Sequence, residues 1–235
     1  MIKVLCFDLF STLVDVGSVP LSIGRMTADI FGLEHEQWNA LCFSAHHEIC
    51  EPTEAFDVIQ TLIHSHSPLV PKALIQQAVE ERQARFDYAL TKHIQDDVLQ
   101  GIEQLKQQNY QLVLVSNAST AEVQAWRDSP LAPLFDHSVF SCAVGLKKPD
   151  AKIYQHAYEL VSVQPAECLF IGDGGSDELV GAKAAGMCTL LMTRFLKNNK
   201  TARQQAHVGV VDGEVESTVE VLEWLAQQSV DSAPL

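Results

Sequence analysis

The residues with the clearest chemical potential lie at the ends of apolar runs. Near the amino terminus such a run ends in Asp8, which is followed by Phe10 and then Thr12. Open α/β sheets hold their ligands beside the carboxyl ends of their parallel strands, so a carboxylate at this point is placed as a nucleophile. The aromatic ring of Phe10, two residues later, can neither donate nor accept a proton.

Further polar groups follow later apolar runs. Ser116 and Asn117 offer a hydroxyl and an amide suited to an oxygen-rich or anionic group. Lys148 stands directly before a proline, on a rigid turn at the start of a helix. Asp173 and Asp177 flank two glycines and a serine, and hard carboxylate oxygens beside a lysine and a phosphoryl group predict a magnesium site. Taken singly, these residues are typical of turns, helix caps and solvated surfaces. Their placement beyond separate strands predicts one shared crevice.

The elements that must position these groups alternate along the chain. Apolar runs typical of buried strands occur at 3–8, 111–116, 138–141, 167–172 and 187–192. Amphipathic helical stretches occur at 98–108, 120–127, 151–161, 176–185 and 217–228. This alternation predicts an α/β fold in which helices cover a parallel sheet.

The gap between the first two strands breaks this rhythm. It contains no convincing strand, but helical patterns occur at 20–31, 35–48, 54–66 and 71–92. We therefore expect an all-helical cap at residues 16–94, inserted into a core formed by residues 1–15 and 95–235. Such an insertion would cover the carboxyl edge of the sheet, exclude water and select the substrate.

Two groups of cap side chains have more than one interpretation. Trp38, Phe43 and Phe56 either line the substrate side of the cap or pack its interior. His46 and His47 are adjacent, so on a helix they point to different faces and are not expected to form one closed metal site. They too are candidates for the substrate side of the cap.

Composition restricts the class of protein further. The chain has 235 residues, 47% of them hydrophobic, and a net charge of −14. That charge repels polyanions, so a nucleic-acid partner is not expected, and a small anionic substrate would need a local positive pocket. The apolar runs are far shorter than the roughly 20 residues that span a bilayer, no signal pattern opens the chain, and the cysteines lack CxxC spacing. We expect a cytoplasmic protein without a membrane partner, as a monomer or homodimer.

The polar groups also fall into four ordered motifs. They are Phe7-Asp8-Leu9-Phe10-Ser11-Thr12, Val115-Ser116-Asn117, Lys148-Pro149-Asp150 with Ile153-Tyr154, and Gly172-Asp173-Gly174-Gly175-Ser176-Asp177. In this order they resemble the motifs of the haloacid dehalogenase-like hydrolase superfamily, in the branch with a helical cap inserted after the first motif. The resemblance extends from residue 3 to about residue 195 and implies a Rossmann-like parallel sheet.

The resemblance implies a role for each motif residue. Asp8 would form a covalent aspartyl intermediate, and Thr12, Ser116 and Asn117 would surround the transferring group. Lys148 would neutralise that group and orient Asp8. The implied ligands of Mg²⁺ are Asp8, the backbone carbonyl of Phe10, Asp173 and Asp177, the last either through water or by ordering its loop.

Phe10 departs from the pattern of the family's phosphatases, which usually carry a second aspartate there to protonate the leaving alcohol and then activate water. The family's dehalogenases carry an aromatic residue at this position, but generally lack the Gly-Asp pair found here at 172 and 173. Their cap arginine also has no counterpart in the usual neighbourhood, where only Arg25 occurs. We therefore expect a Mg²⁺-dependent phosphatase that acts on a small phosphorylated metabolite through an aspartyl-phosphate. The alternatives are a 2-haloacid dehalogenase-like hydrolase and a non-catalytic ligand-binding protein on the same frame.

Overall fold

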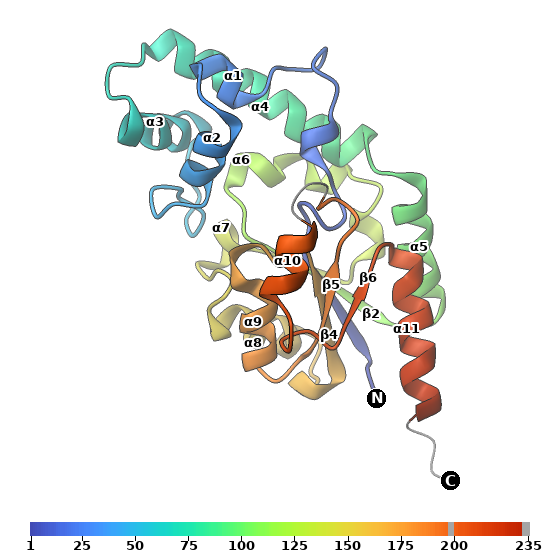
Figure 1. The fold of residues 1–235 in the computed structure, drawn as a ribbon. Helices are drawn as coiled ribbons and strands as arrows, with labels where there is room; N and C mark the ends of the chain where they lie inside the picture. Colours follow the sequence, from blue (N-terminus) through green and yellow to red (C-terminus); the bar gives the residue numbers. More distant parts are fainter. Residues whose placement is uncertain (197–199, 232–235) are drawn as a thin grey trace.

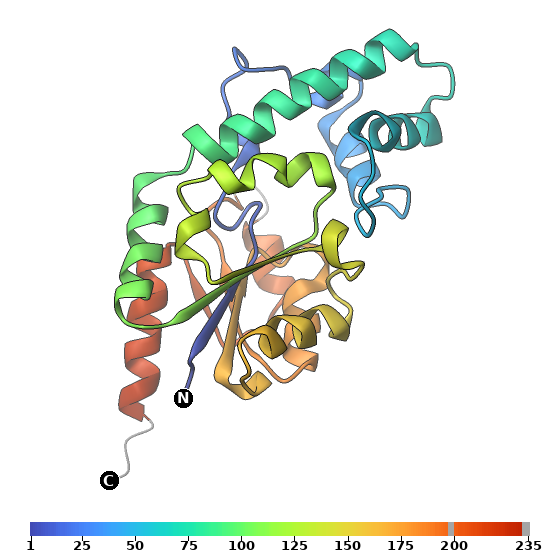
Figure 2. The same ribbon diagram turned by 180° about the vertical axis from the view of Figure 1, so that it is seen from behind.

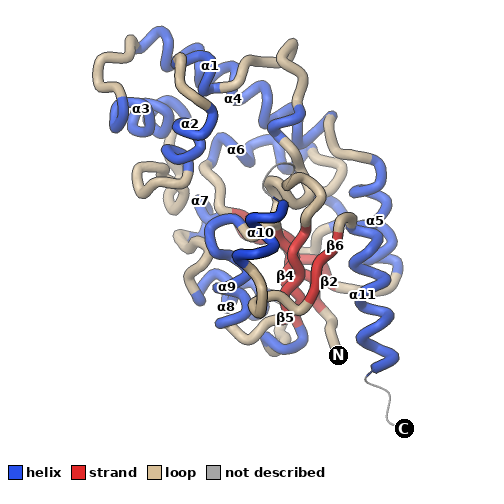
Figure 3. Tube along the Cα trace, in the orientation of Figure 1, coloured by secondary structure: helices blue, strands red, loops and turns tan. Residues whose placement is uncertain are grey.

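The computed structural model describes residues 1–196 and 200–231 and is built on a parallel sheet (Figures 1 and 3). The sheet has six strands in the order β3-β2-β1-β4-β5-β6. Their bounds are β1 (Val4–Phe7), β2 (Gln111–Ser116), β3 (His137–Phe140), β4 (Cys168–Gly172), β5 (Cys188–Met192) and β6 (Gly213–Val215). Every neighbouring pair is parallel. The predicted α/β class is confirmed.

The sheet is covered on both faces because successive side chains of its strands alternate between two apolar clusters. Leu5 and Phe7 of β1 join one cluster with residues of α5 (Asp96–Gln107) and α11 (Thr218–Asp231). Val4 and Cys6 join the other, with residues of α8 (Ala151–Leu160) and α9 (Glu178–Ala184). Figures 1 and 2 show these two helix pairs on opposite sides of the strands. β1 is therefore central, and residues just beyond its carboxyl end are fixed by packing on both sides.

Between β1 and β2 the chain forms a separate group of helices. They are α1 (Thr27–Phe31), α2 (His35–Cys42), α3 (Ala55–His66) and α4 (Lys72–Lys92), preceded by the 3-10 helix η1 (Val16–Ser18). They enclose their own apolar cluster, which includes Trp38, Leu62 and Ile75. In Figures 1 and 2 they lie beyond the carboxyl ends of the strands, at the top of the view. We propose that residues 16–94 are a cap domain on a core formed by 1–15 and 95–235, and call the inserted segment the cap.

The remaining helices are short. They are α6 (Thr120–Val123), α7 (Ser141–Val144), α10 (Lys200–Ala206) and the 3-10 helices η2 (Gln124–Asp128), η3 (Ala132–Leu134), η4 (Pro165–Glu167) and η5 (Gly175–Asp177). Among the described residues, no helix is both long and apolar enough to cross a membrane.

The predicted strands are found within a residue or two of their expected bounds, whereas several helices differ. The pattern at 20–31 yields a helix only from Thr27, and the pattern at 35–48 ends at Cys42. There the Ser44 hydroxyl donates to the carbonyl of Leu41 at 2.6 Å, which offers that carbonyl a partner outside the helix. The pattern at 120–127 divides into α6 and η2, while β6, α7 and α10 had no predicted counterpart.

Candidate active site

Asp8 lies immediately after β1 and is 6% exposed. Its backbone N–H donates to the carbonyl of Ile171 at 2.9 Å, so the pairing of β1 with β4 continues up to the carboxylate. The chain then turns back, with the N–H of Val14 bonded to the carbonyl of Leu9 at 3.0 Å. This turn places the buried Thr12 hydroxyl 2.9 Å from Asp8 Oδ2, to which it donates.

Lys148 approaches Asp8 from the loop before α8. Its ammonium lies 2.5 Å from Asp8 Oδ1 and 2.5 Å from Glu178 Oε2, and its side chain is 2% exposed. Burial alone would lower the pKa of Lys148, but the two carboxylates outweigh burial and raise that pKa. The raised pKa favours the charged form of Lys148 at the carboxyl edge of the sheet.

Asn117 holds the backbone of Lys148 in place. The N–H of Lys148 donates to Asn117 Oδ1 at 2.8 Å, and Asn117 Nδ2 donates to the carbonyl of Lys148 at 2.9 Å. The preceding residue, Ser116, ends β2 and has a buried hydroxyl oxygen with no hydrogen-bond partner among the described residues. An unpaired buried hydroxyl is costly, and such groups in native structures call for an explanation.

Three carboxylates form a cluster at this edge. One oxygen each of Asp8, Asp173 and Glu178 lies within 4.8 Å of the others. The third member is Glu178 and not Asp177, which is exposed and lies outside the cluster. The sequence analysis thus missed Glu178, although it directly follows the last residue of the fourth motif.

The backbone explains how Glu178 reaches the cluster. Ser176 and Asp177 both have left-handed conformations, with φ of 52° and 51°, and Glu178 then begins α9. Glu178 Oε1 accepts from the N–H of Gly174 at 3.1 Å. A Cβ at Gly172 would stand 2.1 Å from the same oxygen, so glycine is needed there for close approach.

Charge repulsion and burial act on this cluster together. Burial, followed by the charge of Asp8, raises the pKa of Asp173 and of Glu178. The carboxylates of Asp8, Asp173 and Glu178 outnumber the single ammonium of Lys148. Their all-oxygen donor set is the kind that a hard divalent cation prefers.

Phe10 faces the cap. Its ring meets the ring of Phe86 on α4 edge to face, with centroids 5.2 Å apart. The contact joins the first motif to the cap through apolar surface. Coordination of a metal by the backbone carbonyl of Phe10 remains a prediction.

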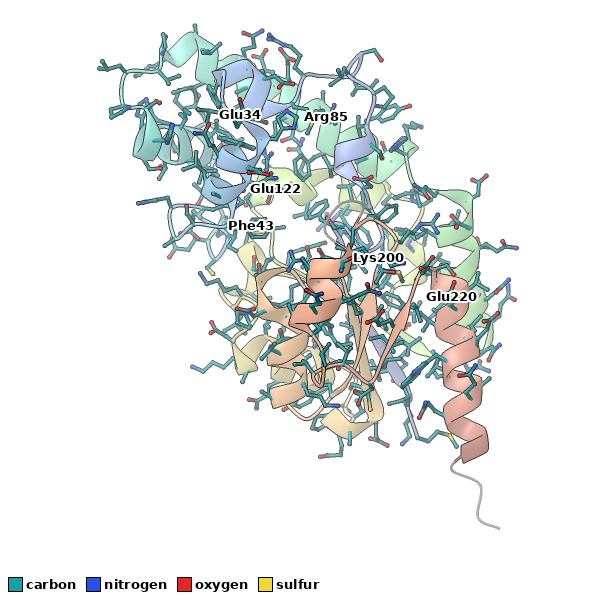
Figure 4. The ribbon with its side chains drawn as sticks, viewed as in Figure 1. Glu34, Phe43, Arg85, Glu122, Lys200 and Glu220 are labelled. Carbon is teal, nitrogen blue, oxygen red and sulfur yellow. The ribbon has the colours of Figure 1, made fainter. Side chains whose placement is uncertain are left out.

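A cavity of about 440 Å³ connects the carboxylate cluster with the cap. Its walls include the site residues Asp8, Phe10, Asn117, Lys148, Asp173 and Glu178 and the cap residues Trp38, Phe43, His47, Arg82, Arg85 and Phe86. Figure 4 shows Phe43 and Glu122 where the inserted helices face the core, with Arg85 farther into the cap. Of the cap residues singled out from the sequence, Trp38, Phe43 and His47 line the cavity, whereas Phe56 packs against the interior of the cap. Arg82 and Arg85 had not been predicted.

The carboxylate of Asp8, the buried Lys148 and the acidic cluster thus lie together at the edge of a parallel sheet, under a helical insertion. The sequence model of one family, haloacid dehalogenase-like hydrolase, matches residues 2–186. The chain belongs to this family of hydrolases.

The chain is similar to relatives with different activities. The chain is 26% identical over 200 residues to (S)-2-haloacid dehalogenase 4A of Burkholderia cepacia, covering 80% of this chain and 81% of the relative. It is 26% identical to glyceraldehyde 3-phosphate phosphatase of Methanopyrus kandleri, over 68% of this chain and 67% of the relative. Against the structure of L-2-haloacid dehalogenase from Xanthobacter autotrophicus the TM-score is 0.69 at 20% identity, covering 96% and 99% of the two chains.

Other curated relatives match only in part. The chain spans 20% of the length of bifunctional epoxide hydrolase 2 from Sus scrofa, 19% of the protein of that name from Rattus norvegicus, and 45% of a glyceraldehyde 3-phosphate phosphatase from Methanothermobacter thermautotrophicus. The family model establishes the family, but relatives with phosphatase and with dehalogenase activity are both similar to this chain. The choice between phosphate and halide chemistry must therefore be argued from the residues of the site.

Proposed function

We propose that this protein is a Mg²⁺-dependent phosphatase that acts on a small phosphorylated metabolite through an aspartyl-phosphate on Asp8. The observation that carries the proposal is the cluster of Asp8, Asp173 and Glu178 beside Lys148. The three carboxylates outnumber the single ammonium of the cluster, and a divalent cation would offset this excess negative charge. A halide displacement needs no such cation, whereas a cation would stabilise the negative charge of a transferring phosphoryl group.

The donor set fits Mg²⁺, which prefers carboxylate oxygens. Asp8, Asp173 and Glu178 would hold the ion with the backbone carbonyl of Phe10, while the exposed Asp177 would act only through water or by ordering its loop. When bound, the ion would supply positive charge to the phosphoryl oxygens.

The side chains of the site would carry out the remaining steps of the reaction. Lys148 orients the carboxylate of Asp8 through its contact with Oδ1, and Thr12 orients it through Oδ2. Asp8 attacks phosphorus, so that a bond from its carboxylate to phosphorus forms as the bond to the leaving oxygen breaks. The unpaired hydroxyl of Ser116 is available to donate to a phosphoryl oxygen. Water then cleaves the aspartyl-phosphate and releases inorganic phosphate.

Phe10 limits the first of these steps. Its ring supplies no proton to the departing alcohol, and loss of a positioned acid typically costs on the order of 10² to 10⁴ in rate. We therefore propose a preference for leaving groups of low pKa, such as phenols or carboxylates.

A dehalogenase is the second candidate, favoured by the apolar Phe10 against Phe86, since a halide departs without a proton. The acidic cluster opposes it, because displacement of a halide by Asp8 gives the carboxylates of Asp173 and Glu178 no evident task. A non-catalytic ligand-binding protein is the third. The buried ion pairs of Asp8 and Lys148 are hard to explain in a protein that only binds.

The deciding experiment measures turnover of p-nitrophenyl phosphate and acetyl phosphate with Mg²⁺ and with EDTA. We expect Mg²⁺-dependent release of phosphate that Asp8→Asn abolishes, while the control Asp128→Asn, at an exposed acidic position, retains it. Metal-independent release of chloride from 2-chloropropionate would favour the dehalogenase instead, and inactivity in both assays would favour the binding protein. A cytoplasmic location and a monomeric or homodimeric state are further proposals from composition.

A further inference from the structure

One wall of the cavity is aromatic and includes Phe10, Phe86 and Trp38. Phe10 and Phe86 pack edge to face with centroids 5.2 Å apart. The guanidinium of Arg82 lies 4.5 Å from the centroid of Phe86 and 5.9 Å from that of Trp38, so the three rings and one planar cation form a continuous surface. All four residues line the cavity.

The cationic side chains along this wall already have partners. Arg82 donates to Glu122 Oε1 at 2.5 Å, and the carboxylate of Glu122 is itself buried. Arg85 is 3% exposed and donates to the backbone carbonyls of Gly24 and Val16, at 2.8 Å each. Apart from Lys148, these two arginines are the only lysine or arginine side chains among the described residues that line the cavity.

The histidines His35 and His47, which line the cavity, do not offer a free positive charge to a substrate either. His35 is exposed and lies 3.0 Å from Asp29. His47 bonds through Nδ1 to the carbonyl of Cys42 at 2.8 Å, and its Nε2 faces Glu122 at 3.8 Å. The acidic side chains of Asp15 and Glu122 also line the cavity. A second anionic group on a substrate would therefore meet the carboxylates of Asp15 and Glu122 and an Arg82 already paired with Glu122. It would also meet Arg85, whose donors are occupied by backbone carbonyls and on which the charges of Asp15 and Asp29 already act.

We propose that the cavity selects a substrate with a single phosphoryl group and an uncharged aromatic or apolar body, and discriminates against substrates with a second anionic group. The body would pack against Phe10, Phe86 and Trp38, in a volume within the usual range of small-molecule sites. Only the placement of the phosphoryl end at Asp8 and Lys148 rests on the proposed function.

Non-hydrolysable phosphonates test this selectivity by binding alone, in the full-length protein with Mg²⁺. Calorimetry compares benzylphosphonate with methylphosphonate, which lacks the aromatic body, and with phosphonoacetate, which adds a carboxylate. We expect benzylphosphonate to bind about tenfold or more tightly than either. Equal affinities, or no detectable binding of benzylphosphonate, would overturn the proposal.

Three variants assign the effect to the wall. Phe86→Ala is expected to remove most of the tenfold advantage of benzylphosphonate over methylphosphonate. Phe56→Ala, which truncates a phenylalanine packed in the cap interior, is expected to preserve it. Glu122→Gln leaves Arg82 without its counter-charge and is expected to strengthen phosphonoacetate binding by about threefold or more. Equal loss in Phe86→Ala and Phe56→Ala would indicate general cap damage and refute the assignment.

Turnover of benzyl phosphate and p-nitrophenyl phosphate is measured separately on the same preparation. Selective phosphonate binding without phosphatase turnover would reject the proposed function and keep the selectivity. Phosphatase turnover without selective binding would keep the proposed function and reject the selectivity.

Discussion

Replacing Phe10 with aspartate tests the explanation of this site most directly. Phe10→Asp would supply a carboxyl group at the position from which an acid protonates the leaving oxygen. We expect turnover of an alkyl ester such as benzyl phosphate to rise by on the order of 10²-fold, the lower end of what a positioned acid contributes. Turnover of p-nitrophenyl phosphate should change little, because its leaving group departs without protonation.

The same substitution has a calculable cost in stability. It removes the edge-to-face contact with Phe86, worth roughly 0.5–1.5 kcal/mol, and the burial of a half-buried ring. Together these losses lower the free energy of unfolding by about 1–3 kcal/mol. The added carboxylate also increases the negative charge beside Asp8 and Asp173, so Mg²⁺ should restore part of the loss.

The assay is the ratio of kcat/KM for benzyl phosphate to that for p-nitrophenyl phosphate, in the wild type, Phe10→Asp and Phe10→Leu. The leucine variant loses the ring without gaining an acid and should retain the wild-type ratio. A folded Phe10→Asp protein with an unchanged ratio would refute our explanation of position 10. A parallel rise for both esters would show that the substitution acts by some route other than proton donation.

Three further predictions concern the metal, pH and packing. Glu178→Gln should weaken Mg²⁺ binding, measured by calorimetry, at least about tenfold, whereas Asp177→Asn should leave it nearly unchanged. A larger effect of Asp177→Asn would show that Asp177, and not Glu178, is the metal ligand. The hydrogen bond from Arg25 lowers the pKa of Glu81 to about 2. Because this folded-state pKa lies below the unfolded value of about 4.3, the contribution of the pair is complete above that value and is lost as pH falls toward 2. The stability difference between wild type and Arg25→Gln should therefore be small at pH 7, since both side chains are partly exposed, and should shrink on acidification. A difference that stays constant with pH in chemical denaturation would contradict it. Gly181→Ala would place a Cβ 2.7 Å from a backbone carbonyl oxygen and 2.7 Å from a buried tyrosine hydroxyl, and should cost about 1–3 kcal/mol in the same assay.

The sheet was predictable because its strands are short apolar runs that end in polar residues, as at Asp8 and Ser116. Strand β6, with three residues, is too short to give such a pattern, and it forms by pairing with β5. The predicted ends of the cap helices were less accurate than those of the strands. At Ser44 a local hydroxyl decides where α2 stops, and hydrophobic periodicity carries no information on that competition.

The site was predictable where position in the sequence determines position in space. Asp8 and Lys148 meet because both lie beyond the carboxyl edge of one sheet, Asp8 directly after the central strand β1 and Lys148 after the edge strand β3 and the helix α7. Glu178 could not be distinguished from Asp177 by spacing, because two consecutive left-handed residues decide which carboxylate turns inward. Arg82 and Arg85 lie far along α4, and only tertiary packing brings them to the cavity.

The insertion of the whole cap between β1 and β2 also has an evolutionary consequence. Apart from Phe10, the aromatic wall and its arginines come from this single contiguous segment, whereas Asp8, Lys148 and the acidic cluster come from the core, in loops beyond the sheet and at the start of α9. Substitutions that retune what the protein recognises can therefore accumulate in one stretch of the gene without disturbing the groups that break the bond. Phe10 is the exception, because it belongs to the reacting loop and contacts the cap. A lineage that changes its chemistry at this position must also adjust its recognition surface.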